Sequence, residues 1–388
     1  MPIETSRPVA AGVVTALVGF TSAFVVVLQG LTAVGATPSQ AASGLLAVTV
    51  LMGLSSIVLS LTTRLPITVA WSTPGAALLA STGAVDGGWP AAVGAFVVTG
   101  ALVLATGLLP ALGALITRIP ASVAQAMLAG IVMQLCLGPV TGMAANPWAV
   151  GPVVLVWVIS LRLLPRGASP LAFVAAAVVI AVHLGRSGTP VDGASLVPRL
   201  ELTAPTLTLG GLVGIALPLY LVTMASQNVP GVAVMRGFGY EVPWRRAMLV
   251  TGAGTVLGAP AGGHAINLAA ISAALAAGPD AGEDRSRRWI ASATSGVVLV
   301  PIGIAAAGFA TLVSLAPEGV VPAVAGLALV GTLAASLRAA LAEPSEQVPA
   351  VVTFAVAASG IAVAGVSAAF WALVAGLVLR LALRRTTA

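Results

Sequence analysis

The sequence predicts an all-α polytopic membrane protein with 14 transmembrane segments, arranged as two inverted repeats of seven in which segments 3 and 10 are broken. Three observations lead to this fold class. The 388 residues are 59% hydrophobic and only 7% charged, whereas soluble proteins carry about 25% charged residues. Long apolar runs recur along the whole chain, as expected of membrane-spanning helices. Two of these runs are interrupted by Pro and Gly at matching positions in the two halves.

Cutting the apolar runs at Pro, Gly and charged residues gives the predicted spans. In chain order they are Val9–Leu31, Gln40–Thr62, Pro66–Ser81 (broken), Ala91–Ile116, Ala121–Leu137, Trp148–Leu164, Pro170–Gly185, Leu209–Asn228, Arg246–Leu257, Pro260–Ala277 (broken), Ile290–Leu315, Val320–Leu341, Val348–Gly360 and Val366–Leu383. The first run is too long for the hydrophobic part of a signal peptide, so we interpret it as the first span.

The Arg residues set the expected orientation. With the N-terminus in the cytoplasm, all but two of the 17 basic residues fall on the cytoplasmic side, the exceptions being Arg186 and Arg199. Positive charge is enriched in cytoplasmic loops, and a wrong number of spans would scramble this alternation. Both termini are therefore expected in the cytoplasm. The basic residues are scattered between apolar spans, so they predict contact with a lipid bilayer and no nucleic-acid partner.

The stretches Arg64–Gly83 and Gly258–Gly278 are the predicted broken segments. Each begins with an irregular run rich in Pro, Gly or β-branched residues and then turns into a short helix of small residues. Non-helical backbone at membrane depth is tolerated only where protein covers it or where it lines a cavity, and paired interruptions indicate a transporter's substrate site. The two helix N-termini, expected at Thr73–Gly75 and Ala265–Asn267, would face one cavity and favour an anion.

The second half of the chain echoes the first. Gly19–Leu79 contains Gln29 near the end of one span, then a second span and a broken segment, and Gly214–Leu275 repeats this order with Gln227. Seven spans precede the second copy, so it enters the membrane from the opposite side. This arrangement is an inverted repeat, which is typical of secondary transporters.

His264 is the titratable side chain expected at a broken segment, directly after Gly263. A buried charge is costly in a membrane, so we expect His264 to be neutral at rest and to gain a proton when an anion binds, which would couple the proton to the substrate. The alternative is a neutral His that hydrogen-bonds irregular backbone. Asn267 is expected one helical turn later, so that both side chains face the cavity.

Three amides and one turn complete the candidate substrate site. Gln227 and Asn228 end the eighth span, and Gln29 is the matching amide of the first; substrate contact and hydrogen bonding between helices are both open for them. In the turn Trp71–Gly75, Thr73 is placed like an N-cap and Pro74 fits the first helical position. Trp71 is a candidate wall for a ring-shaped ligand or a packing residue. Ser72 and Gly75 lie at the same helix start.

Other chemistries are poorly supported. All 11 acidic residues lie in predicted loops or at span ends, which argues against an enzyme with paired carboxylates and against a proton pump with a buried carboxylate. Cys136 is the single cysteine, so no disulfide within the chain and no metal–thiolate site are expected. His183, near a span end, is expected to be incidental. We expect no cofactor, no metal and no enzymatic activity.

Three stretches resemble a known family: AWSTPGAALL at Ala70–Leu79, SQNVPGVAVMRGFGY at Ser226–Tyr240 and GAPAGGHAINLAAISAAL at Gly258–Leu275. Through them the sequence is similar, along essentially the whole chain, to the benzoate membrane transport (BenE) proteins. The resemblance implies proton-coupled uptake of benzoate across the inner membrane of a bacterium.

That family is in turn similar to the uracil-permease type of fold. The resemblance implies a core domain made of residues 1–117 and 206–316 and a gate domain made of residues 118–205 and 317–388, with a homodimer through the gate as a further expectation. In the wider group the eighth span usually carries a carboxylate near the substrate. Here the local residues are Ala225, Ser226 and Gln227, which suits an anionic ligand because a fixed carboxylate would repel it.

The expected function is therefore a secondary active transporter that imports benzoate, or a similar aromatic carboxylate, with protons by alternating access. One alternative is a transporter of another small anion or of a nucleobase on the same fold. The other is a passive anion channel, which predicts flux without proton dependence.

Overall fold

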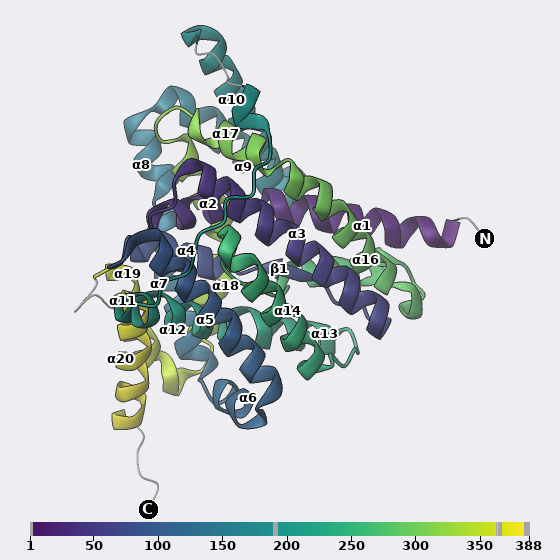
Figure 1. Cartoon of the computed structure of the whole chain (residues 1–388), viewed down its shortest axis with the longest axis vertical. Coiled ribbons are helices and arrows are strands. Elements are labelled where there is room, and N and C mark those ends of the chain that lie inside the picture. Colours follow the sequence, from purple (N-terminus) through teal and green to yellow (C-terminus); the bar gives the residue numbers. More distant parts are fainter. Residues whose placement is uncertain (1–2, 189–192, 362, 364–366, 384–388) are drawn as a thin grey trace, which may run out of the picture.

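The computed structural model describes residues 3–188, 193–361, 363 and 367–383 (Figure 1). Its α-helices are α1 (Ile3–Thr21), α2 (Phe24–Ala33), α3 (Pro38–Thr63), α4 (Thr73–Thr82), α5 (Gly88–Leu108), α6 (Pro110–Thr117), α7 (Ala121–Cys136), α8 (Gly138–Ala145), α9 (Pro147–Leu163), α10 (Ala168–Ser187), α11 (Leu209–Gly211), α12 (Leu217–Thr223), α13 (Val229–Gly237), α14 (Trp244–Gly258), α15 (Ile271–Ala277), α16 (Trp289–Ile304), α17 (Ala306–Ser314), α18 (Val320–Ala340), α19 (Gln347–Ser359) and α20 (Ala368–Leu383). Two strands accompany them, β1 (Val69–Trp71) and β2 (Ile266–Leu268).

Shorter turns complete the described chain. The π-helical stretches are η3 (Leu212–Ala216) and η4 (Met224–Asn228), and the 3₁₀ turns are η1 (Pro165–Gly167), η2 (Gly193–Leu196), η5 (Ala259–Ala261), η6 (Pro279–Ala281), η7 (Arg285–Arg287) and η8 (Pro344–Glu346). The predicted last span, Val366–Leu383, begins outside the described residues; its helix is described from Ala368.

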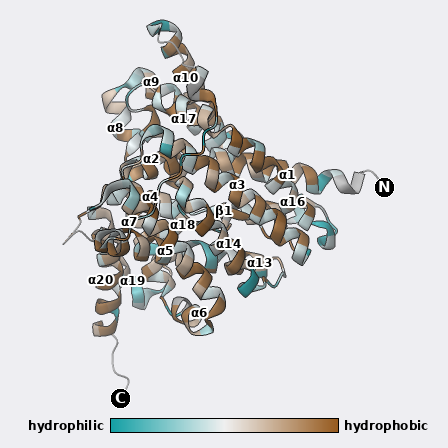
Figure 2. Ribbon diagram, in the orientation of Figure 1, coloured by the Kyte–Doolittle hydropathy of each residue, from teal (hydrophilic) through white to brown (hydrophobic). Residues whose placement is uncertain are grey.

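The helices have the length and hydropathy of membrane spans. Within the described residues, seven helical stretches are long and apolar enough to cross a membrane, or eight if the bent pair of α16 and α17 is one span. Large apolar side chains are exposed in helical stripes, for example Val174, Val178 and Val182 on α10. Brown, apolar residues cover much of the outer helix faces in Figure 2. Exposed apolar stripes of this kind are stable in contact with lipid, so the chain is a multi-pass membrane protein.

Several predicted helices are interrupted in the structure. The predicted first span, Val9–Leu31, lies within one membrane-spanning stretch, Ser6–Ala33, but Ser22 and Ala23 interrupt its helix between α1 and α2. The predicted span Ala91–Ile116 stops at Leu109, just before Pro110, and α16 meets α17 at an angle of 54°. Apolar content alone does not reveal such breaks, because the pieces on both sides of each break are apolar.

The predicted end of the eighth span at Asn228 is wrong. The helical path runs from Leu209 to Gly237 and passes through Pro230. Pro lacks the backbone N–H of a regular helix and normally breaks it. Here η4, a π-helical stretch with a wider turn, directly precedes α13 and accommodates the missing hydrogen bond.

The strands β1 and β2 form a two-stranded antiparallel ribbon, in which Ala70 lies opposite Asn267. Backbone hydrogen bonds extend it at both ends, from Ser72 N to Ala265 O (2.8 Å) and from Ala269 N to Thr68 O (2.9 Å). The ribbon therefore satisfies the backbone groups of two irregular stretches that lie far apart in the sequence.

The helices pack into two groups. In one, α16 packs on α1 and α3, α14 packs on α3 and α5, and α2 packs on α4. In the other, α7 and α8 pack on α18, α19 packs on α7 and α20, and α10 packs on α9. In Figure 1, α1, α3 and α16 run side by side towards the N-terminus at the right, while α8, α9 and α10 lie together in the upper part of the view.

The extended segment 200–208 ties one end of the first group together. Thr203 N donates to Pro260 O (2.8 Å), Thr206 N donates to Pro90 O (3.0 Å), and Trp89 Nε1 donates to the Thr203 hydroxyl (3.0 Å). In Figure 1 this connection between α10 and α11 crosses the face of the molecule as a teal trace. Segment 200–208 is thus anchored at Thr203 and Thr206 on the group that contains α3, α5 and α14.

Candidate functional site

Helix α4 begins beside the ribbon, and its first turn is capped by Ser72. The Ser72 hydroxyl accepts a hydrogen bond from Gly75 N (3.1 Å) and also bonds the Thr223 hydroxyl of α12 (2.8 Å). The sequence assigned the N-cap to Thr73, which is one residue too late: Thr73 and Pro74 are the first and second helical residues. The backbone N–H groups in the first turn of a helix have no acceptor within that helix. Of the first three helical residues, Pro74 has no N–H and Gly75 N donates to Ser72, which leaves the N–H of Thr73 without an acceptor from α4.

The second half-helix begins later than predicted. Ala265–Asn267 was expected to be its N-terminus, but Ile266–Leu268 is strand β2 and α15 starts at Ile271. His264 and Asn267 therefore do not lie one turn apart on a helix. The cause is the pairing with β1, a contact across nearly 200 residues that local propensity does not show.

A cavity of about 430 Å³ lies beside the ribbon and the start of α4. It is bounded by α1, β1, α4, η4 and α15 on one side and by η1, α10 and α18 on the other, so both helix groups contribute to it. The residues that line it are Val18, Gly19, Ser22, Ala23, Ala70, Trp71, Thr73, Pro74, Pro165, Ser169, Pro170, Gln227, Ala269, Ala270, Ser272, Leu275, Ala328, Leu329, Gly331 and Thr332. We call it the central cavity. None of these described lining residues is charged.

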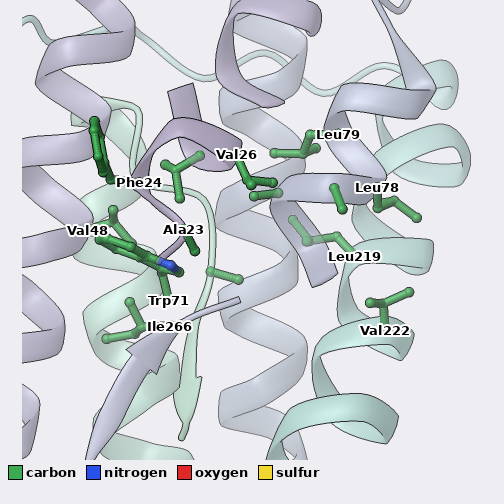
Figure 3. Close-up of a cluster of buried hydrophobic side chains, with 14 of the residues drawn as sticks. Ala23, Phe24, Val26, Val48, Trp71, Leu78, Leu79, Leu219, Val222 and Ile266 are labelled. Carbon is green, nitrogen blue, oxygen red and sulfur yellow. The ribbon is translucent and has the colours of Figure 1, made fainter. Parts of the chain in front are cut away.

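Three of the predicted site residues line the central cavity: Trp71, Thr73 and Gln227. Trp71 lies among Ala23, Phe24, Val48 and Ile266 (Figure 3), and its ring meets Phe20 edge to face with centroids 5.5 Å apart. It is thus both a cavity wall and part of the packed core, with 2% of its surface exposed.

Four predicted residues are part of the framework around the cavity. Asn228 Oδ1 accepts from Leu268 N (2.9 Å), which fixes η4 to the ribbon. His264 Nε2 lies 3.2 Å from Ser72 O and links the loop before β2 to the cap of α4. Asn267 donates to Leu268 O (2.9 Å). With Ser72, these side chains are fully or almost fully buried, and none of them lines the cavity.

The remaining predicted residues have other surroundings. Gly75 and Gly263 are sites of close packing: a Cβ at Gly75 would lie 2.4 Å from Leu219 Cδ1, and one at Gly263 would lie 3.1 Å from Gly258 O. Gln29 lines a separate cavity of about 150 Å³ between α2, α3, α17 and α18. We call it the Gln29 cavity.

Sequence reasoning missed the hydroxyl groups that line the central cavity on both sides. They are Ser22, Ser169, Ser272 and Thr332. Ser and Thr inside apolar helices are weak signals, because they commonly bond a carbonyl of their own helix, as Ser22 does with Gly19 O (3.2 Å). In the described part of the chain, no cluster of His, Cys, Asp or Glu could hold a metal ion.

A family model decides the relationship of this chain to known proteins. The model described as "Benzoate membrane transport protein" matches residues 3–382. The chain belongs to this family. Its members are membrane transporters, so the chain is a transporter and not an enzyme.

Two curated relatives of the family are similar over almost their whole length. Inner membrane protein YdcO of Escherichia coli (strain K12) is 35% identical over 366 residues, which cover 94% of this chain and 93% of that protein. The benzoate membrane transport protein of Acinetobacter baylyi is 30% identical over 372 residues, which cover 95% and 92%.

Solved structures share the fold of this family member. The transmembrane domain of a cyanobacterium bicarbonate transporter, BicA, superposes with a TM-score of 0.58 at 16% identity, covering 91% of this chain and 97% of that one. The murine Solute Carrier 26 family member A9 anion transporter, in an inward-facing state, gives a TM-score of 0.61 at 12% identity and covers 97% and 68%.

Proposed function

We propose that this protein is a secondary active transporter that imports benzoate or a similar aromatic carboxylate together with protons by alternating access. The observation that carries the proposal is the central cavity. Its volume of about 430 Å³ lies in the range of small-molecule sites, roughly 300–1,000 Å³. Its walls combine one aromatic residue, the largely buried Trp71, with hydroxyl and amide groups and no fixed charge, which suits a small aromatic anion. The relative that is 30% identical is named as a benzoate transport protein, in agreement.

The carboxylate would bind where α4 begins. Thr73 lines the cavity there, and its backbone N–H belongs to the end of α4 that carries a partial positive charge. The Gln227 amide and the Ser272 hydroxyl line the same cavity and can donate further hydrogen bonds. These neutral donors stabilise an anion without a permanent ion pair, which a transporter must break in every cycle.

The aromatic ring would lie against Trp71 and neighbouring apolar residues. Trp71, Ala23 and Leu329 line the cavity together, and aromatic pairs gain about 0.5–1.5 kcal/mol beyond burial of their area. A carboxylate without a ring loses this contact. The cavity therefore favours aromatic acids over equally charged small anions such as formate.

We also propose the 14-segment inverted repeat as the working architecture, with a core of residues 1–117 and 206–316 and a gate of residues 118–205 and 317–388. The two packing groups of helices support this division. The antiparallel pairing of β1 with β2, in which Ala70 faces Asn267, supports a two-fold axis through the ribbon. The central cavity then lies between core and gate, where a relative movement of the two would expose it alternately to each side.

In this architecture the central cavity opens towards the cytoplasm. A second cavity of about 490 Å³ shares Val18 and Leu275 with it and extends along α1 as far as Arg7 and Asp280. With both termini in the cytoplasm of a bacterial cell and the protein in its inner membrane, this path leads inwards.

Uptake of labelled benzoate into proteoliposomes with an inward-directed proton gradient tests the proposed function. Uptake faster than in protein-free liposomes is expected, because neutral benzoic acid crosses lipid unaided and sets the background. It is expected to collapse with the gradient and to be competed by benzoate but not by uracil or sulfate. Gradient-independent flux would instead identify a passive channel, and flux equal to empty liposomes would reject benzoate as the substrate.

His264 is proposed to carry the coupled proton. In the tautomer whose Nε2 donates to Ser72 O, Nδ1 holds the free lone pair, and within the described structure this buried Nδ1 has no hydrogen-bond partner. A proton there would add positive charge behind the cap of α4, next to the proposed carboxylate site. Replacing His264 with Ala or Gln should therefore reduce the stimulation of uptake by the proton gradient about tenfold.

Initial uptake rates measured with and without the gradient check this expectation. The Gln variant keeps a side-chain N–H that can donate to Ser72 O, so it preserves this contact while removing the titratable group. The matched control is His183→Ala, since His183 is exposed near the end of α10 and its loss should leave the stimulation unchanged. Full stimulation in both His264 variants would remove this residue from the proton route.

A further inference from the structure

Five aromatic rings gather at one end of the central cavity. Phe20 and Phe24 stack with centroids 5.1 Å apart, and Phe309 of α17 lies 4.9 Å from Phe20 and 5.3 Å from Phe24. Trp71 meets Phe20 edge to face. Phe173 of α10 completes the cluster, 4.8 Å from Phe24 and 6.2 Å from Phe309. We call these residues the ring cluster.

The ring cluster joins the two packing groups of helices. Phe20, Phe24, Trp71 and Phe309 come from α1, α2, β1 and α17, which belong to one group. Phe173 is the cluster's single ring from α10, which packs on α9 in the other group. The contacts of Phe173 with Phe24 and Phe309 are therefore the part of the cluster that a relative movement of the groups would break.

The order of residues along α1, α2 and α10 places the ring cluster beyond the central cavity. Val18, Gly19 and Ser22 line the cavity, and Phe24 follows at the start of α2. Ser169 and Pro170 line it from α10, and Phe173 follows about one turn later.

The Gln29 cavity continues this order on the far side of the rings. It is lined by Leu28 and Gln29, one turn beyond Phe24 on α2, and by Ala310 and Val313, just beyond Phe309 on α17. Helix α18 runs in the opposite direction and contributes Val321 to the Gln29 cavity but Ala328 to the central cavity. Seven residues of helix span about 10 Å, so a layer of that thickness separates the two cavities.

We propose that the ring cluster is the barrier that separates the central cavity from the Gln29 cavity, and that it opens where Phe173 meets Phe24 and Phe309. The Gln29 cavity is then the closed remnant of the path to the other side of the membrane. The barrier itself follows from the packing; its opening during transport rests on the proposed function. The rings are apolar and closely spaced, so the closed layer excludes both water and a carboxylate.

Thiol accessibility tests the barrier without any substrate. Cys136→Ser removes the single cysteine, and one reporter is then added on each side of the rings. Gly331→Cys places a thiol in the central cavity, where an added Cβ meets nothing within 4 Å, and Ser314→Cys places one in the Gln29 cavity. A charged, membrane-impermeant thiol reagent is applied to each face of oriented proteoliposomes in turn.

In the parent, the Gly331→Cys reporter should react only from the face where α1 begins, and the Ser314→Cys reporter only from the opposite face. Phe173→Ala removes both ring contacts between the groups within the ring cluster. The rate at which Gly331→Cys reacts from the opposite face should then rise at least about tenfold above its rate from that face in the parent. Phe370→Ala is the matched control: it removes a ring that packs on Trp371 elsewhere in α20 and should change neither pattern.

Two results would overturn the proposal. The first is reaction of both reporters from the same face in the parent. The second is an unchanged rate for Gly331→Cys from the opposite face in Phe173→Ala, while its reaction from the first face is retained and shows a folded protein. Phe173→Leu, which keeps apolar bulk, is assessed by the same criteria should the Ala variant not fold. A failure of benzoate uptake leaves these readouts unaffected, so the two hypotheses fail separately.

Discussion

Replacing Gln227 with Glu should weaken benzoate binding about 100-fold. Gln227 lines the central cavity from η4, beside the proposed carboxylate site at the start of α4. The substitution keeps the shape of the side chain and adds one negative charge. Two like charges about 6 Å apart repel by about 3 kcal/mol at an effective dielectric constant of about 20, and about 1.4 kcal/mol corresponds to a factor of ten in affinity.

Equilibrium binding of labelled benzoate to the purified protein measures this effect directly, and KM for uptake gives a second readout. Gln227→Met is the matched neutral variant. It loses the amide donor but adds no charge, so its affinity should fall by less than tenfold. Equal affinities of the Glu variant and the parent, with both folded, would show that the carboxylate binds elsewhere in the cavity.

Gly296→Val should destabilise the protein by about 3 kcal/mol or abolish its folding. Gly296 of α16 and Gly53 of α3 form the closest approach of these two helices: an added Cβ at Gly296 would lie 2.4 Å from Gly53 O and 2.7 Å from Ile57 Cγ1. The neighbouring atoms include backbone, which cannot rotate away. Small residues allow such contacts between membrane helices, where packing replaces the hydrophobic effect as the driving force.

Thermal unfolding in detergent, followed by the loss of the monodisperse peak in gel filtration, measures this change. Gly308→Val is the control in the adjoining helix α17, because an added Cβ there meets nothing within 4 Å. It should unfold at about the same temperature as the parent. Similar unfolding of the two Val variants would mean that α3 and α16 can move apart at little cost.

The sequence was sufficient for the features that depend on local chemistry. Pro66 and Pro74, with the β-branched residues between them, predicted an irregular stretch followed by a short helix, and β1 and α4 have this form. The apolar runs predicted a membrane protein, and the three quoted stretches indicated the family. These signals lie within a few residues of the structure that they determine.

The misses concern features that depend on tertiary contacts. Strand β2 replaces the predicted helix start at Ala265–Asn267 because β1 pairs with it. The helix continues through Pro230 because η4 adapts its turn. The interruption between α1 and α2 at Ser22–Ala23 has no adjacent Pro or Gly from which it could have been predicted.

The candidate site was predicted only in part, for the same reason. Gln227 and Trp71 were found because an amide or a ring near a predicted break is conspicuous. Ser169 and Thr332 line the cavity from the other helix group, and no local pattern connects them with the ribbon. Phe173 belongs to the ring cluster although about 100 residues separate it from Trp71, so its role becomes visible only when the helices are assembled.

The ribbon also constrains how the protein can be made. In the proposed architecture, the stretch around β1 enters the membrane long before β2 is synthesised. The Thr68 carbonyl and the Ser72 N–H then lack the partners that Ala269 and Ala265 later provide. Unpaired backbone is strongly disfavoured in lipid. The first half of the chain is therefore an incomplete intermediate, which the insertion machinery or a transient interaction with other helices must shelter until the second half arrives. The centre of the molecule is complete only when the two stretches pair.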